Sequence, residues 1–405
     1  MSPLVPGAGR PFRYAFNGME IFFGENCLLS LAAHLDVLGL SRALVITGSN
    51  VGRNAEAMGP VQAALGGRLV AVFDGTEPTK GLASSVAGVE AMEESGADVL
   101  IALGSGSSLD TARLMSLLQA NTVPLEELVS QRDGVLVKIP EPDRARIPVV
   151  VVPTTFAGAD LSDIAVAELT PDLKPPGHKG IMRIWGQAAP IAAVYDPRLF
   201  ASTPLSAMLG SCVNGFSKGM ETLWSRKGNG ITDSTASRGL RLMRNAVPGL
   251  PEKDSASLTA AVEGLILVQY GRQLSVIHAV GHAFSRRYPV QQGLVHGVSL
   301  PQVARFVFER ADARRELVAS ALLPQRQSAS NEDIAESIVA ELDEIRRILG
   351  FPRALNEHLR NVEVDFPMLA KAVASDALSP LSDGPEGFDP SLEELEALVS
   401  RVWYG

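Results

Sequence analysis

The first half of the chain alternates short apolar runs with longer segments of helical periodicity. The apolar runs are ALVIT (43–47), LVAVF (69–73), DVLIAL (98–103) and PVVVVP (148–153). Runs of this length, rich in β-branched residues, are typical of strands buried on both faces of a parallel sheet. The segments between them, such as 80–96 and 108–120, have the spacing of helices. The alternation predicts an α/β fold with a Rossmann-like parallel sheet.

The second half of the chain has a different pattern. From Pro204 onward strand signals almost vanish, and segments with helical periodicity follow one another: LSAMLGSCVNGFSKGMETLWS, SLTAAVEGLILVQYGRQLSVIHAVGHAFS and NEDIAESIVAELDEIRRILG. The change predicts an α/β domain over 1–197 and an all-helical domain over 198–405. The polar, Gly/Pro-rich segment 379–391 is expected to form a loop before a last short helix.

The composition narrows the class of protein. With 46% hydrophobic and 20% charged residues among 405, the chain can bury a large globular core. Its net charge of −9 argues against a nucleic-acid partner, because phosphate binding needs a basic surface. Two distant cysteines imply no disulfide framework, and we identify neither a signal peptide nor a membrane-spanning run. We expect a cytoplasmic enzyme with a small-molecule substrate, no membrane partner and a homodimer as candidate assembly.

A glycine- and serine-rich turn follows the apolar run 98–103. Its residues are Gly104, Ser105, Gly106 and Ser107. Glycines let the backbone approach a diphosphate, and the N–H groups at the start of a helix bind its oxygens. Asp110 is expected in the first turn of that helix, where a carboxylate is favoured. The turn is neither a Walker loop nor GxGxxG, since Leu109 replaces the third glycine, and a purely structural turn is the alternative.

Polar turns also follow two other strands of the predicted sheet. Thr154 and Thr155 come directly after the run 148–153, and Gly48 and Ser49 come after the run 43–47. Ligands of open α/β sheets bind beyond the carboxyl ends of the strands. The alternative for the threonines is an ordinary Pro-Thr turn. Because such turns recur at one edge of the sheet, we favour a bound nucleotide.

Three of the six histidines lie in the segment IHAVGHAFSRRYPVQQGLVH, 277–296. His278 and His282 are four residues apart, so they share one face of a helix. This spacing is compatible with a metal site, but an imidazole also titrates near neutral pH and can act as a general acid. His296 is expected to orient its neighbours. No role is assigned to the remaining histidines, His34, His178 and His358.

Five motifs, taken in order, resemble the iron-containing alcohol dehydrogenase superfamily, and most nearly its maleylacetate reductases. They are FDGTEP (73–78), GSGSSLDTAR (104–113), VPTTFAG (152–158), AAVYDP (192–197) and NGFSKGMETLW (214–224). The resemblance implies a β-hairpin and a helix before the first nucleotide strand, a dinucleotide-binding α/β domain, a helical domain and an active cleft between the two domains.

The resemblance also implies a bound NAD or NADP. Its diphosphate would lie on the turn 104–107, with Thr154 and Thr155 near the adenine or nicotinamide portion. Gly48 stands where NAD-using relatives often have Asp, so the choice between NAD and NADP stays open, with Arg53 a distant candidate for binding a 2′-phosphate. Lys179 lies close to the position of a family lysine that reaches the nicotinamide.

The metal-ligand positions of the family have largely changed in this chain. Metal-binding members use one Asp and three His, and the resemblance places these positions at Asn214, Lys218, His278 and Gln292. Only His278 keeps a ligand of the family type. An ammonium has no lone pair, and its charge opposes a divalent cation. Amide oxygens are poor ligands for transition metals. We therefore expect no metal, with Asn214, Gln292 and His296 as cleft residues.

Two functions are compatible with these residues. The first is a metal-independent NAD(P)H-dependent reductase, in which Lys218 stabilises negative charge and His278 or His282 delivers a proton. Arg286 and Arg287 would add anion-binding charge for an acidic substrate. The second is a non-redox isomerase, lyase or cyclase of specialised metabolism that uses the same lysine and histidines. A solvated Lys218, paired with Glu221, is the structural alternative.

Overall fold

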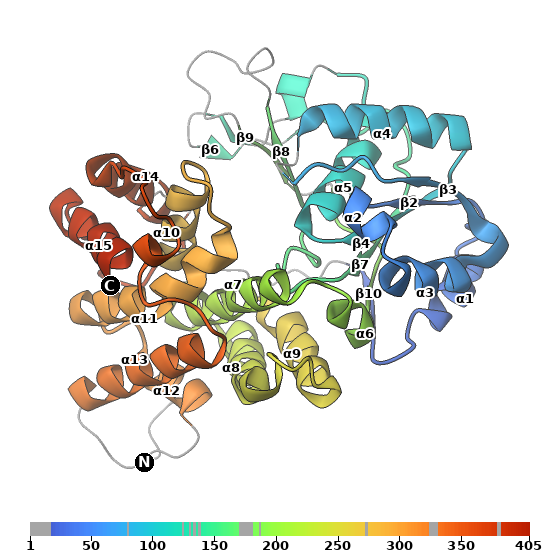
Figure 1. The fold of residues 1–405 in the computed structure, drawn as a ribbon. Coiled ribbons are helices and arrows are strands. Elements are labelled where there is room, and N and C mark those ends of the chain that lie inside the picture. The colour runs from blue at the N-terminus through green and yellow to red at the C-terminus, as the bar shows by residue number, and fades with distance from the viewer. Residues whose placement is uncertain are drawn as a thin grey trace. The chain divides into compact units, whose positions relative to one another are not determined.

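A computed structural model of the chain describes residues 18–78, 81–123, 125–128, 131–132, 135–136, 139–169, 181–185, 188–271, 274–323, 331–378 and 382–405. The described residues form two compact units that meet in sequence between Thr203 and Pro204 (Figure 1). The division falls there rather than after residue 197, because the next few residues bind the first unit. Asn54 Nδ2 donates to the Ser202 carbonyl at 3.1 Å, and Thr203 Oγ1 donates to the Thr154 carbonyl at 2.8 Å.

The first unit is built on a six-stranded sheet in the order β1-β10-β7-β4-β2-β3. The strands are β1 (Glu20–Phe23), β2 (Ala43–Ile46), β3 (Leu69–Phe73), β4 (Val99–Gly104), β7 (Val149–Pro153) and β10 (Ala192–Tyr195). Every neighbouring pair is parallel, which confirms the predicted parallel sheet. The strand β1 pairs with β10; any hairpin partner from residues 1–17 falls outside the described residues.

Helices cover both faces of this sheet (Figure 1). They are α1 (Leu29–Val37), α2 (Ser49–Gly52), α3 (Ala55–Leu65), α4 (Leu82–Ser95), α5 (Gly106–Ala120) and α6 (Pro197–Ala201). Side chains of α1 and α3 pack with alternate strand residues into one apolar cluster, because successive residues of a strand face opposite sides. Two short antiparallel pairs complete the unit: β5 (Gln131–Arg132) with β6 (Val135–Leu136), and β8 (Ile164–Glu168) with β9 (Ile181–Trp185).

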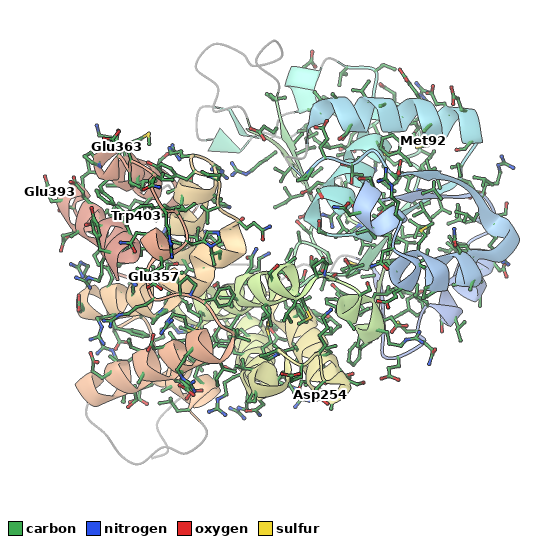
Figure 2. The ribbon with its side chains drawn as sticks, viewed as in Figure 1. Met92, Asp254, Glu357, Glu363, Glu393 and Trp403 are labelled. Atoms are coloured by element: carbon green, nitrogen blue, oxygen red, sulfur yellow. The ribbon has the colours of Figure 1, made fainter. Side chains whose placement is uncertain are left out.

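The described part of the second unit is helical throughout, as predicted. Its helices are α7 (Leu205–Trp224), α8 (Gly230–Ala246), α9 (Ser255–Val268), α10 (Val276–Ser285), α11 (Gln292–Arg310), α12 (Arg315–Leu322), α13 (Asn331–Ile348), α14 (Phe366–Ala377) and α15 (Leu392–Tyr404). The long apolar segment 257–285 divides into α9 and α10. Asp254 caps α9 by accepting from the Ser257 N–H, and Trp403 stacks on Phe284 with their ring centroids 6.5 Å apart. Asp254 and Trp403 are labelled in Figure 2.

The helix α7 lies at the centre of this unit. Its residues from Gly215 to Trp224 are all buried, and it contacts α8, α9, α10, α11 and α12. Polar residues on such a helix face other protein groups instead of water, so they must find partners there. Within the described ranges, no helix combines the length and apolar character needed to cross a bilayer.

Candidate functional site

The glycine- and serine-rich turn joins β4 to the start of α5. Gly104 has a φ of +133°, which side-chain-bearing residues rarely adopt. Ser105 is the N-cap residue of α5, yet its side chain makes no capping hydrogen bond; its Oγ lies 3.1 Å from that of Ser107. The first N–H groups of this long helix are therefore not capped by Ser105. This geometry fits a bound diphosphate, which would be held at the positive end of the helix dipole.

The other turns at this sheet edge lie beside the first one. The Thr154 N–H donates to the Gly104 carbonyl at 2.9 Å, which joins the ends of β7 and β4. Thr76 Oγ1 lies 3.3 Å from Ser108 Oγ, and a Cβ on Gly48 would approach Thr76 Oγ1 to 3.3 Å. Thr155 is half-buried in the same loop as Thr154, and Ser49 begins α2 after Gly48. The structure thus brings Gly48, Gly104 and Thr154 to one edge of the sheet, together with Thr76 and Ser108.

Asp110 does not have the position that we expected. It lies in the second turn of α5, is 2% exposed, and is 3.6 Å from Nη1 of the buried Arg113. Arg113 Nη2 donates to the carbonyls of Ala159 and Asp160, both at 2.8 Å. Tyr195 also donates to Asp160 Oδ2 at 3.0 Å. The expectation of a carboxylate at the helix start was wrong, because the helix begins at Gly106. Asp110 instead helps to hold the loop after β7.

Gly104→Ala is expected to weaken binding of the dinucleotide. The added Cβ would lie 3.0 Å from Ser108 Oγ, and the backbone angle would be strained by about 1–3 kcal/mol. Isothermal titration with NADH and NADPH measures the effect. Gly66→Ala is the matched control, since Gly66 has a φ of +54° at an exposed turn with open space around it. Equal affinity in both variants would contradict a role of this turn in diphosphate binding.

In the helical unit, His278 is enclosed by polar partners. Its side chain is on α10, is 3% exposed, and has both ring nitrogens engaged. Nδ1 lies 2.5 Å from Glu221 Oε2, and Nε2 lies 2.9 Å from Asn214 Oδ1. Burial lowers the pKa of His278 well below its usual value, and the charge of Lys218 lowers it further. The two contacts fix the orientation of the ring.

Glu221 fastens α7 to the start of α10. Its Oε1 accepts from the Ile277 N–H at 2.7 Å and from the His278 N–H at 3.1 Å. The Ser275 N-cap side chain does not cap α10, so a carboxylate from another helix takes that place. Burial raises the pKa of Glu221 to about 7, although backbone N–H groups oppose the shift. We expected Glu221 only as a partner of Lys218; its three-residue spacing from Lys218 was the one available signal.

His296 packs against His278 from the helix α11. The two ring centroids are 4.6 Å apart, and His296 Nε2 lies 3.4 Å from Gln292 Nε2. Burial lowers the pKa of His296 well below its usual value, with further contributions from His278 and His282. A Cβ on Gly281 would lie only 2.2 Å from His296 Nε2, so α10 and α11 approach closely here. The structure thus brings His296 and Gln292 to the same cluster as His278.

His282 is in a more open environment than His278. Its side chain is 23% exposed, and Nδ1 lies 3.2 Å from Asp376 Oδ2 on α14. Arg286 Nη1 reaches the same oxygen at 3.5 Å. Asp376 was missed in the sequence, because ninety-four residues separate it from His282. Arg286, which we expected to bind a substrate anion, pairs with a carboxylate of the protein instead.

Lys218 is buried in the helical unit, at 9% exposure. The alternative of a solvated helix lysine is therefore wrong. Its charge lowers the pKa of both His278 and His296, which places it electrostatically within the same cluster. The remaining candidates lie elsewhere: Arg287 donates to the Ala283 carbonyl, His358 is exposed, and His34 pairs with Glu20 in the α/β unit. His178 and Lys179 lie outside the described residues.

The cluster does not fit a divalent metal. At the four family positions stand one imidazole, two amides and an ammonium, and the imidazole has both nitrogens bound to Glu221 and Asn214. The buried Lys218 would bring a positive charge against a cation. Among the described residues, no group of three or more His, Cys, Asp or Glu side chains is arranged to hold a metal ion.

Models of two parts of one protein family match the chain. The iron-containing alcohol dehydrogenase model matches residues 19–197, and the C-terminal model of the Fe-containing alcohol dehydrogenase family matches residues 208–386. Together they cover most of both units. The chain belongs to the iron-containing alcohol dehydrogenase family.

Individual relatives are distant but are matched over most of their length. Alcohol dehydrogenase 4 of Saccharomyces cerevisiae (strain YJM789) is 26% identical over 88% of this chain and 90% of that protein. Maleylacetate reductase of Rhizobium sp. (strain MTP-10005) is 27% identical over 82% of this chain and 85% of that protein. The family and these relatives support the assignment of the chain as an NAD(P)-dependent oxidoreductase.

Solved structures confirm the fold. The Rhizobium maleylacetate reductase structure superposes with a TM-score of 0.75 at 23% identity, covering 97% of this chain and 98% of the other. The sulfoacetaldehyde reductase of Bifidobacterium kashiwanohense, solved in complex with NAD+, superposes with a TM-score of 0.82 at 16% identity. That match covers 98% of this chain and all of the other. The predicted combination of a Rossmann-like unit and a helical unit is therefore correct.

Proposed function

We propose that the chain is a metal-independent NAD(P)H-dependent reductase of a carbonyl or enone in a small anionic substrate. The observation that carries this proposal is the buried Lys218. The resemblance assigns Lys218 to the position of a metal ligand, and its charge lowers the pKa values of the His278 and His296 imidazoles. A fixed cation among neutral groups can perform the electrostatic task of a metal ion, which is to stabilise negative charge on a substrate oxygen.

The turn after β4 supports dinucleotide binding in the α/β unit. The Gly104–Ser107 backbone and the start of α5 would hold the diphosphate, and Thr76, Ser108 and Thr154 surround this turn. We extend to this chain the NAD+ binding of the sulfoacetaldehyde reductase structure. Gly48 offers no carboxylate that would exclude a 2′-phosphate, so NADP is an equal candidate. When bound, the reduced nicotinamide supplies a hydride to the electrophilic carbon of the substrate.

The residues of the helical unit supply the rest of the chemistry. The Lys218 ammonium would stabilise the oxygen on which negative charge develops, and it would attract an anionic substrate. Glu221 and Asn214 fix the His278 ring, which forms one wall of the cluster. An imidazole of α10 would then protonate the oxygen of the product.

A second candidate is a non-redox isomerase, lyase or cyclase. The observation that favours it is that the same cluster pairs two imidazoles with buried or half-buried carboxylates, Glu221 and Asp376. Such pairs can carry out acid–base chemistry without a nucleotide.

Cofactor oxidation distinguishes the two candidates. Purified protein is mixed with NADH or NADPH and a panel of small anionic carbonyl and enone compounds, with maleylacetate among them, and loss of the reduced cofactor is followed by absorbance. A reductase oxidises the cofactor only when a substrate is present, and the product is the corresponding alcohol or saturated acid. Failure to bind either dinucleotide by isothermal titration would refute the reductase and favour the second candidate.

A further inference from the structure

The two imidazoles of α10 have different surroundings, and this difference separates their roles. His278 is 3% exposed, its Nδ1 is bound to Glu221, and its Nε2 is bound to Asn214. A proton on such a ring can pass only to those two partners unless the cluster opens. A general acid needs a nitrogen within hydrogen-bond reach of the substrate. His278 therefore fits a fixed wall of the site and does not fit a proton donor.

His282 has the geometry of a proton donor. One turn further along α10, it lies on the same helix face as His278, with the ring centroids 6.3 Å apart. Its side chain is 23% exposed, so it can exchange protons with water. Asp376 Oδ2 lies 3.2 Å from Nδ1 and comes from α14, which packs directly on α10. A carboxylate at Nδ1 holds the proton on that nitrogen and leaves Nε2 to gain and lose the second proton.

The charges around this pair also match such a role. Asp376 Oδ2 is shared between His282 and Arg286, whose Nη1 lies 3.5 Å away. A carboxylate that accepts from two donors is fixed in orientation, and it stabilises the imidazolium form of its histidine partner. The arrangement at His282 differs from that at His278, where burial and the nearby Lys218 favour the neutral ring.

We propose that His282 is the proton donor of the reduction and that Asp376 is its positioning residue. The inference rests on the proposed reductase function. As the hydride adds to the substrate carbon, the electron pair of the C=O double bond moves onto oxygen. The bond between Nε2 and its hydrogen breaks, and that proton forms the O–H bond of the alcohol. His282 is left as a neutral ring whose Nδ1 keeps its proton and donates it in a hydrogen bond to Asp376 Oδ2, and Nε2 regains a proton from water.

The kinetic test is a double-mutant cycle. His282→Ala is expected to lower kcat by about 10²- to 10⁴-fold with KM and cofactor affinity little changed. Asp376→Asn should lower kcat by about 10- to 100-fold, because it disturbs the tautomer of His282 and removes the charge. In the His282→Ala background, Asp376→Asn should have no further effect, since residues that act as one unit are not additive. His358→Ala, at an exposed histidine, is the control.

Two outcomes would overturn the proposal, one from the cycle and one from a separate variant at His278. Additive losses would mean that Asp376 acts separately from His282. A folded His278→Gln variant that loses more kcat than His282→Ala would place the proton on His278 instead. Gln at 278 retains polar atoms toward Glu221 and Asn214, so that it preserves more of the packing than Ala would.

A readout without turnover separates failure of this inference from failure of the proposed function. Nitrogen-15 NMR of histidine-labelled protein, with the signal assigned by its loss in His282→Ala, should show the neutral His282 ring protonated on Nδ1. Asp376→Asn should shift that tautomer balance. A ring protonated on Nε2 in the wild type would refute the positioning role. If the tautomer is as expected but no carbonyl compound is reduced, the reductase proposal fails while the pairing of His282 with Asp376 stands.

Discussion

Lys218→Met is expected to lower kcat by about 10²- to 10³-fold while the protein stays folded. Methionine has nearly the length of lysine but no charge, so it removes the cation without opening a cavity. A buried ammonium is costly to desolvate, and therefore the substitution should leave the melting temperature unchanged or raise it. Steady-state kinetics of NAD(P)H oxidation, together with thermal unfolding of the same samples, measures both effects.

The control for this substitution is Lys371→Met on α14. Lys371 is exposed, and its loss removes an equal charge from the same unit without touching the cluster. Its kinetic constants should match those of the wild type. A Lys218→Met enzyme with wild-type kcat would show that the charge at this position has no part in the reaction. A rise in KM alone would assign Lys218 to substrate binding rather than to stabilisation of the developing charge.

Glu221→Ala is expected to destabilise the helical unit by about 3–5 kcal/mol. The substitution breaks the buried pair of Glu221 with His278 and leaves the hydrogen-bonding groups around Glu221 unsatisfied. The Ile277 and His278 N–H groups would lose their acceptor, and His278 Nδ1 would lose its carboxyl partner. Each such buried donor costs about 1–3 kcal/mol when left unsatisfied. Urea unfolding measures the global loss, and hydrogen exchange of the α10 amides should show faster exchange at the start of that helix.

The matched control is Glu263→Ala. Glu263 lies on α9 and pairs with Arg238 at 3.1 Å, with the two side chains 37% and 66% exposed. Such surface pairs contribute about 0–1 kcal/mol, so this variant should unfold near the wild-type midpoint. Glu221→Gln should lie between the two, because one amide oxygen still accepts from the backbone of α10. If Glu221→Ala were as stable as Glu263→Ala, the anchoring of α10 by Glu221 would be wrong.

Much of the fold could be predicted because its signals are local. The run 69–73 is β3 itself, and the runs 43–47, 98–103 and 148–153 differ from β2, β4 and β7 by one residue at an end or at each end. Strands buried on both faces show as uninterrupted apolar runs. The division between α9 and α10 was not predicted, because both helices are apolar and the segment that joins them, 269–275, is short.

The candidate site was only partly visible in the sequence. His278 and His282 share a helix face, so their proximity follows from spacing alone. Their carboxylate partners do not follow from it, because Glu221 and Asp376 come from α7 and α14, and only the packed structure brings them to α10. The position of Asp110 was misjudged for a related reason. A shift of a few residues in the helix start moves a side chain from the helix end to a buried face.

The structure also changes the interpretation of the histidine-rich segment 277–296, whose spacing is compatible with a metal site. Its histidines have three different environments: His278 is fixed by Glu221 and Asn214, His296 is fully buried against it, and His282 is partly exposed beside Asp376. Lys218, at the position that the resemblance assigns to a metal ligand, is buried. The segment therefore fits an acid–base site organised around a cation of the protein itself.

We propose that Lys218 supplies the positive charge that a metal ion would otherwise supply to the substrate oxygen. The rate of NAD(P)H oxidation by metal-depleted protein tests this role most directly. The protein is dialysed against a chelator, its metal content is measured by mass spectrometry, and turnover is recorded on the same sample. We predict full activity with far less than one metal ion per chain, and no gain when Fe²⁺ or Zn²⁺ is added. Activity that disappears with a stoichiometric metal ion, and returns with it, would contradict this claim.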